Sequence, residues 1–384
     1  MKSKGIFILL FCLLTACHQQ QQPVVAPWGD TVVAEDAAQT EASETEDFDL
    51  DEIEHSGELI VLTVSGPDTY YDYHGKALGI HALLCRQLAD SLGVRLRIEV
   101  CRDTTELLFR LRQGDADLVA YPLTPPDSLS PGWQVAAEKP QLAEAIGQWY
   151  SLARLQWARN EEQRLLTAPR VQRKVFAPML NREGGIISRY DALFQQHART
   201  IHWDWRLIAA QCYQESTFDP HAVSWAGAKG LMQIMPKTAD HLGLDREDLY
   251  VPEKNIAAAV GYLAELEQSF NDVHDRRQRQ DFVLAAYNGG TFHIRDAMAL
   301  AARDGKNQYS WNDVAPYVLR LSQPQYYQDP LVKSGYMRGC ETVDYVRLIR
   351  ERYQQYRGVR GRTSSGSATP QKSVNERHRN KFKI

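Results

Sequence analysis

The sequence has few of the features that mark nucleic-acid-binding, metal-dependent or membrane-spanning proteins. Its formal net charge is only −4, so it lacks the basic excess expected of a nucleic-acid-binding protein. The histidines are scattered and no Cys-x-x-Cys motif occurs, so we expect neither a metal ion nor another cofactor. Beyond the N-terminus, no stretch is long and apolar enough to span a membrane. Two classes of function remain: an enzyme, and a binding or scaffolding protein.

The N-terminus has the pattern of a lipoprotein signal. Lys2 and Lys4 precede an apolar run over residues 6–14, and Leu14-Thr15-Ala16-Cys17 follows. The run is too short to span a bilayer, whereas a cysteine after small residues is typical of cleavage and lipid attachment. We expect residues 1–17 to be a signal and Cys17 to anchor the chain in the cell envelope, on the outer membrane facing the periplasm. The alternative is an ordinary signal peptide with an incidental cysteine.

The sequence has only six cysteines, and four of them matter for the folded protein. Cys12 would leave with the signal, and Cys17 would carry the lipid. In an oxidising compartment, Cys85 could pair with Cys101, and Cys212 with Cys340. Free buried thiols are the alternative, and the sequence does not decide between the two.

Three segments lack the apolar content of a folded domain. Residues 18–55 are rich in glutamine and then in acidic side chains, which predicts a disordered tether. Residues 159–185 are charged and predict a linker with at most a short helix. Residues 358–384 predict a disordered tail that turns basic. Two domains are expected between these segments, at residues 56–158 and 186–357.

The first domain is predicted to contain a parallel sheet. Strands at residues 59–64, 94–100 and 117–121 alternate with helices at 80–92 and 104–113. Through Gly57-Glu58-Leu59-Ile60-Val61-Leu62, Gly79 and Gly114-Asp115-Ala116-Asp117-Leu118, this α/β domain resembles one lobe of the periplasmic solute-binding proteins that bind amino acids.

Two departures argue against a ligand-binding clamshell in this lobe. Ser128 stands where such proteins usually carry an arginine for the ligand carboxylate. Residues 133–136 and a helix at 141–156 look like the segment that returns from the second lobe, which leaves no room for that lobe. We therefore expect the lobe to have a docking or positioning role, with cell-wall proteins as candidate partners, in preference to small-molecule sensing.

The second domain is predicted to be mainly helical and contains one unusual glutamate. Asp204 is a suitable N-cap for a helix over residues 205–215, in which Ile208, Cys212 and Glu215 share one stripe. Burial and the helix dipole would both raise the pKa of Glu215, as a general acid requires. A solvated glutamate at a helix end is the alternative. Further helices are expected at 186–198, 236–242, 252–270, 279–287, 294–304, 311–321 and 341–356.

Four motifs occur in order along this domain. They are Gln214-Glu215-Ser216, Gly230-Leu231-Met232-Gln233-Ile234-Met235-Pro236, Ala285-Ala286-Tyr287-Asn288-Gly289-Gly290 and Glu341-Thr342-Val343-Asp344-Tyr345-Val346. With them, residues 187–357 resemble the catalytic domain of the lytic transglycosylases, in the lysozyme-like superfamily. One departure is Thr291-Phe292-His293, where the family usually has a further glycine before the histidine.

The resemblance implies a role for each of these motifs. Glu215 would be the catalytic acid, the hydroxyl of Tyr345 would face it, and Glu341 would support the site. The remaining residues would bind the glycan: Ser216, Gly230, Met232, Gln233, Tyr287, Asn288 and Tyr345.

The reaction that the resemblance implies is cleavage of peptidoglycan glycan strands without a second catalytic carboxylate. Glu215 would protonate the oxygen between N-acetylmuramic acid and N-acetylglucosamine, and the product would carry a 1,6-anhydro ring. A lysozyme-type hydrolase would use the same acid together with a positioned water. A non-catalytic lipoprotein that binds the cell wall is the other alternative.

Overall fold

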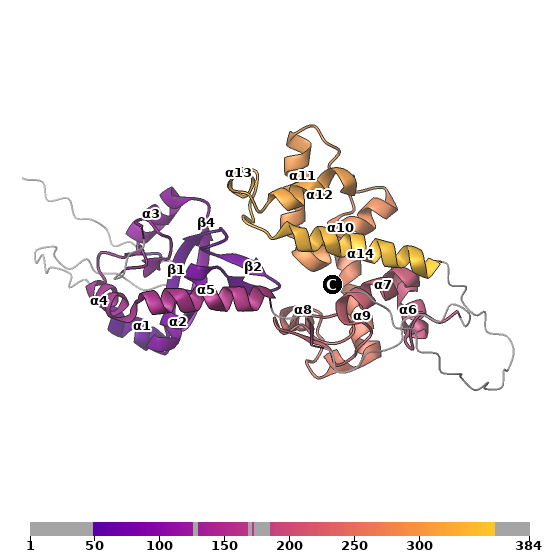
Figure 1. Cartoon of the computed structure of the whole chain (residues 1–384), viewed down its shortest axis with the longest axis horizontal. Coiled ribbons are helices and arrows are strands. Elements are labelled where there is room, and N and C mark those ends of the chain that lie inside the picture. Colours follow the sequence, from indigo (N-terminus) through magenta and orange to yellow (C-terminus); the bar gives the residue numbers. More distant parts are fainter. Residues whose placement is uncertain (1–48, 126–129, 168–170, 173–184, 358–384) are drawn as a thin grey trace, which may run out of the picture. The chain divides into compact units, whose positions relative to one another are not determined.

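The computed structural model describes residues 49–125, 130–167, 171–172 and 185–357 (Figure 1). Within them, an α/β lobe precedes a mainly helical domain, as the sequence predicts. The predicted signal, Cys17, the tether up to residue 48, Ser128 and the C-terminal tail lie outside the described residues. In the described part of the chain, no helix combines the length and the apolarity needed to cross a membrane.

The lobe is built on a four-stranded sheet with the order β4-β1-β5-β6. Strand β1 (Glu58–Val64) pairs in parallel with β4 (Arg95–Cys101) and β5 (Leu118–Val119). Strand β6 (Gln134–Val135) pairs with β5 in the antiparallel direction, so the predicted parallel sheet is in fact mixed. Helices α2 (Ile80–Leu92) and α3 (Thr104–Arg112) match the prediction closely and pack against β1.

Three predictions around the lobe differ from the structure: one helix, the start of the linker and the end of the tether. The expected helix at 141–156 is two helices, α4 (Pro140–Trp149) and α5 (Leu152–Thr167), because Tyr150 adopts an extended backbone conformation. Helix α5 also runs into the predicted linker. Helix α1 (Leu50–Ser56) occupies the end of the predicted tether. The Asp49 carboxylate accepts hydrogen bonds from the backbone of both α1 and α4, which ties this helix to the lobe.

A β-hairpin that the sequence analysis missed projects from the lobe. Strands β2 (Tyr71–Tyr73) and β3 (Lys76–Leu78) pair in the antiparallel direction. The two loop residues, His74 and Gly75, have φ angles of 52° and 71°. Positive φ at both positions is typical of the tight turn whose twist matches that of paired strands.

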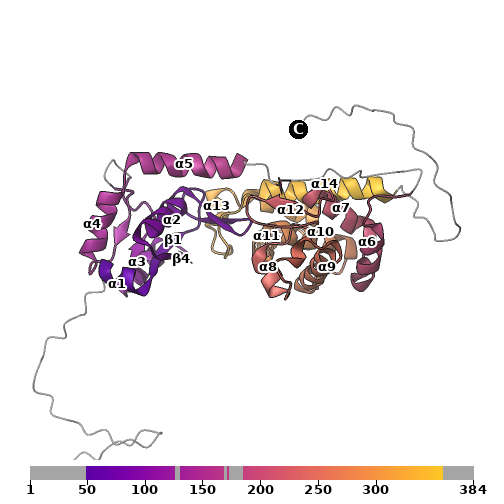
Figure 2. The same cartoon turned by 90° about the horizontal axis from the view of Figure 1, so that it is seen from below.

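The second domain consists mainly of helices packed around a shared core. Phe194, Phe218, Phe270 and Phe282 are among its fully buried side chains. Helix α14 contacts α7, α10 and α12 (Figure 2), so it reaches most of the core. A short strand β8 (Val223–Ser224) pairs with β7 (Val171–Gln172). The helices are α6 (Asp191–Ala198), α7 (Trp205–Ser216), α8 (Pro236–His241), α9 (Pro252–Ser269), α10 (Arg276–Gly289), α11 (Thr291–Arg303), α12 (Trp311–Arg320), α13 (Pro324–Tyr327) and α14 (Gly339–Arg357), with 3₁₀ turns at Arg199–Ile201 and Asp248–Tyr250.

Candidate active site

Glu215 lies in the last turn of α7, where the sequence predicts it. The Asp204 side chain caps the start of the helix by accepting a hydrogen bond from the backbone of Arg206. At the other end, Thr217 and Phe218 have φ angles of 57° and 63°, which residues other than glycine rarely adopt. This turn ends the helix abruptly and leaves Glu215 half-buried at its end.

The surroundings of Glu215 favour the protonated acid up to neutral pH. Burial raises the pKa of Glu215 to about 7, and the hydrogen bond from Tyr345 opposes the rise. The Tyr345 hydroxyl donates to Glu215 Oε1 at 2.5 Å. Tyr287 and Cys212 also interact with Glu215, and burial raises the pKa of each, so both stay neutral. A carboxyl group with this pKa can donate a proton and later take one back near pH 7.

Close packing and hydrogen bonds within the protein fix the conformation of the loop between α7 and α8. Gly230 has a φ of 80°, and a Cβ atom there would collide with the Leu249 carbonyl and the Asn255 side chain. Asn255 is fully buried; it accepts a hydrogen bond from the Met232 backbone at 2.8 Å and donates to the Leu249 carbonyl at 2.8 Å. The close approach that Gly230 permits is therefore to its own chain, not to a sugar.

Tyr287 and Asn288 belong to α10, whereas the prediction ended that helix at Tyr287. The Tyr287 hydroxyl donates to the Met232 carbonyl at 2.8 Å, which fastens α10 to the loop. Asn288 Oδ1 accepts a hydrogen bond from Thr342 Oγ1 at 2.8 Å, which fastens α10 to α14. Tyr287 thus lies beside Glu215, Asn288 joins α10 to α14, and each side chain has a hydrogen-bond partner within the protein.

Glu215, the loop and Asn288 fall within one recognisable segment. Residues 192–310 match the model of the transglycosylase SLT domain. We call this segment the SLT region. It ends before α14, so Tyr345 completes the surroundings of Glu215 from outside it.

Known proteins resemble the chain over part of its length. A membrane-bound lytic murein transglycosylase F from Maricaulis maris is 42% identical over 165 residues, which cover 43% of this chain and 35% of the relative. The chain therefore matches about a third of that relative's length.

Two solved structures show weaker similarity. The 70 kDa soluble lytic transglycosylase SLT70 from Escherichia coli is 25% identical, with 44% of this chain and 24% of that chain covered and a TM-score of 0.30. The arginine-bound domain 1 of TmArgBP is 21% identical, with 29% of this chain and 98% of that chain covered and a TM-score of 0.23.

Three residues of the SLT region that were expected to bind the substrate lie inside the protein instead. Ser216 and Met232 are fully buried, and Gln233 is 8% exposed. The Ser216 hydroxyl donates to the Cys212 carbonyl of its own helix at 3.2 Å. The Gln233 amide donates to the carbonyls of Ala222 and Gly230. The hydrogen bonds of Ser216 and Gln233 stabilise the turn and the loop, and a role of these residues in glycan binding stays a prediction.

Glu341, expected to support the site, has hydrogen-bond partners that the sequence analysis did not predict. The residue is 8% exposed. Oε1 accepts a hydrogen bond from the Tyr73 hydroxyl at 2.5 Å, and Oε2 lies 3.3 Å from His74 Nε2. Both partners lie on the β2–β3 hairpin, which no motif had indicated. Tyr73 and His74 are far from Glu341 in the sequence, so only the folded structure shows that they contact it.

Gln211 is a second residue that the sequence analysis passed over. It is fully buried on α7, one turn before Glu215, and its side chain lies near the Tyr345 hydroxyl without meeting the geometry of a hydrogen bond. The signal that could have found it is a polar side chain on the apolar stripe of a helix, the same signal that singled out Glu215.

The four cysteines of the two domains are free thiols in the structure. Cys85, Cys101 and Cys212 are buried, and Cys340 is exposed. Neither of the two pairings left open by the sequence is present. Cys212 Sγ instead donates to the Leu231 carbonyl at 3.3 Å, so it stabilises the position of the loop beside α7.

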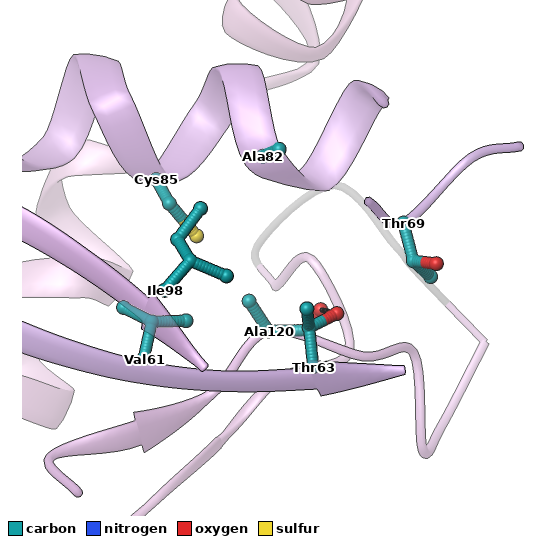
Figure 3. A pocket seen from close by; sticks show the side chains of 7 residues that line it. All are labelled: Val61, Thr63, Thr69, Ala82, Cys85, Ile98 and Ala120. Atoms are coloured by element: carbon teal, nitrogen blue, oxygen red, sulfur yellow. Dashed lines mark hydrogen bonds between the residues drawn. The ribbon is translucent and has the colours of Figure 1, made fainter. Parts of the chain in front are cut away.

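The lobe contains a small pocket between β1 and α2 (Figure 3). Its lining is mostly apolar, and it has no room for a water molecule. The Thr63 and Thr69 hydroxyls both donate to backbone carbonyls, so they are not aimed at a ligand. Across the described residues of the whole chain, no group of three or more His, Cys, Asp and Glu side chains is arranged to hold a metal ion. The pocket lining consists of Val61, Thr63, Thr69, Ala82, Cys85, Ile98 and Ala120.

Proposed function

We propose that this chain is a lytic transglycosylase that cleaves peptidoglycan, with Glu215 as its catalytic acid and base. The observation that carries the proposal is a half-buried carboxyl group with a pKa of about 7, held by the Tyr345 hydroxyl. The match of residues 192–310 to the transglycosylase SLT domain and the similarity to a lytic murein transglycosylase support it.

The proposed reaction uses Glu215 twice. Glu215 first protonates the glycosidic oxygen between N-acetylmuramic acid and N-acetylglucosamine as the bond from C1 breaks. The acetamido group of the muramic acid stabilises the positive charge that develops at C1. The Glu215 carboxylate then takes the proton of the C6 hydroxyl while that oxygen bonds to C1. The product is a 1,6-anhydro ring, no water is consumed, and the enzyme regains its proton.

The deciding experiment is mass spectrometry of the muropeptides that the lipid-free chain releases from purified peptidoglycan. The control is the Glu215→Gln variant, which keeps the shape of the side chain and loses the acid. Anhydromuramyl ends that disappear in the variant are the expected result. Reducing ends would show a hydrolase instead, and release no greater than that of the variant would favour a non-catalytic wall-binding lipoprotein.

We also infer that Cys17 carries a lipid that holds the protein at the outer membrane, facing the periplasm. The sequence around Cys17 supports this, as does the similarity to a relative described as membrane-bound. The substrate would then be the adjacent peptidoglycan, and cell-wall proteins remain candidate partners of the lobe.

A further inference from the structure

Tyr73 contacts two elements that flank Glu215. Its hydroxyl donates to Glu341 on α14 at 2.5 Å. Its ring stacks on Trp225, with ring centroids 5.7 Å apart and an interplanar angle of 24°. Trp225 directly follows β8 and lies within the loop between α7 and α8 that contains Gly230 and Gln233. One side chain of the lobe therefore connects α14 with the loop.

The rest of the hairpin tip fits closely against the same two elements. His74 Nε2 lies 3.3 Å from Glu341 Oε2, and the Arg338 guanidinium lies 5.5 Å from the centre of the Tyr73 ring. A Cβ atom on Gly75 would come within 3.0 Å of the Met235 side chain. Met235 is the last residue of the same loop, so the hairpin contacts the loop at two places.

The contact with Glu341 bears on the position of Tyr345. Glu341 is in the first turn of α14, and Tyr345 is one turn further along the same helix. A nearly buried carboxylate is unfavourable unless polar partners satisfy it. Arg338, just before α14, lies 3.8 Å from Glu341 Oε1, and the hairpin adds Tyr73 and His74, so the hairpin supplies part of what stabilises the first turn of α14. The next turn carries the hydroxyl that donates to Glu215.

We propose that Tyr73 is a positioning residue for Glu215: by joining Glu341 to Trp225, it holds α14 where the Tyr345 hydroxyl meets the acid. The proposal rests on the proposed function in taking Glu215 as the catalytic acid. It assigns the lobe a task that needs no bound small molecule.

The test compares Tyr73→Phe with Tyr71→Phe in the full lipid-free chain. Tyr71 is on the same strand, but its hydroxyl donates to Glu162 of α5 and interacts with Arg338, not with Glu341. Losing the hydroxyl of Tyr73 should lower kcat about five- to tenfold, the effect of one hydrogen bond, with KM changed less than twofold. Tyr71→Phe should leave both constants unchanged. Equal values of kcat for the two variants would overturn the proposal.

Hydrogen exchange gives a readout that does not depend on activity. The backbone amides of residues 341–346 should exchange faster in Tyr73→Phe than in Tyr71→Phe or the natural chain. Unchanged exchange in Tyr73→Phe would overturn the proposal, as would faster exchange with an unchanged kcat. If the natural chain released no anhydromuramyl product, the proposed function would fail, while the exchange experiment would still show whether Tyr73 holds α14.

Discussion

Glu215 combines two properties that a single carboxyl group rarely has. It is buried enough for its pKa to rise to about 7, yet it keeps part of its surface accessible at the end of α7. The Tyr345 hydroxyl stabilises the ionised form and keeps the rise moderate. The hydrogen-bonded pair therefore gives Glu215 a pKa that suits both proton transfers of the proposed reaction at neutral pH.

The activity should depend on pH through this pair. The first step needs protonated Glu215, so kcat/KM should fall as the pH rises through about 7. Tyr345→Phe removes the hydrogen bond that lowers the pKa of Glu215, so the fall should move to higher pH. The pH profile of anhydromuramyl release measures both effects. Tyr353→Phe is the control, since that hydroxyl is on the same helix but donates to Asp204. If kcat/KM of Tyr345→Phe fell at the same pH as in the natural chain, or at a lower pH, this account would be contradicted.

The same group should make the fold less stable at high pH. The pKa of Glu215 is about 7 in the folded chain against an ordinary 4.5, so the native state binds more protons between these values. The free energy of unfolding should therefore fall as the pH rises from about 4.5 to about 7. Glu215→Gln removes this loss and should be more stable than the natural chain at pH 8 by about 1–3 kcal/mol, a range that allows for partial solvent screening.

Urea denaturation at pH 4 and pH 8 measures this difference. The difference in the free energy of unfolding between Glu215→Gln and the natural chain should nearly vanish at pH 4, where Glu215 is protonated in both the folded and the unfolded chain. Glu144→Gln, which changes an exposed glutamate on α4, should show no such dependence on pH. A Glu215→Gln variant that is equally or less stable than the natural chain at pH 8 would show that Glu215 is not destabilised by burial.

At the scale of elements, polar side chains hold together the four elements around the site: the loop, α9, α10 and α14. Asn255 of α9 binds the backbone of the loop, Tyr287 of α10 binds it from another side, and Thr342 of α14 binds Asn288 of α10. Each of these bonds joins elements that are distant in sequence. The motif residues thus stabilise the frame around Glu215 more than they line a surface.

Gly230 should be the least replaceable residue of the loop. Gly230→Ala puts a Cβ atom against the Leu249 carbonyl and the Asn255 side chain at a φ of 80°, and we expect a loss of more than about 2 kcal/mol of stability. Gly243→Ala is the matched control, because Gly243 has a φ of 66° and open space around it. It should cost only about 1 kcal/mol. Similar losses for both variants in denaturant unfolding would show that packing at Gly230 is unimportant.

For the whole molecule, the expected lipid anchor decides where the catalytic site works. Cys17→Ala should prevent lipid attachment and move the protein from the membrane fraction to the soluble fraction of the cell envelope. Immunoblots of the two fractions measure this. The purified variant should release the same muropeptides as the lipid-free chain, since Cys17 precedes both domains. A variant that stays in the membrane fraction would mean that something other than Cys17 holds the protein there.

The sequence determined the features that depend on residues close together in the chain. The alternating strands and helices of the lobe, the cap at Asp204 and the end of α7 after Glu215 all follow from local patterns, and the structure has them. The hairpin was missed because its strands have only three residues each, too few for a periodic pattern. The break at Tyr150 was missed because apolar residues continue through it.

Only the tertiary structure decided which side chains meet. Tyr73 and Glu341 are 268 positions apart, so no local pattern could pair them. The sequence also could not predict that Ser216 and Met232 are buried, because a motif shows that residues occur together but not which of them faces the core. Burial and hydrogen bonds between distant segments form only when the whole chain packs, and they position the one carboxyl group that the sequence had singled out.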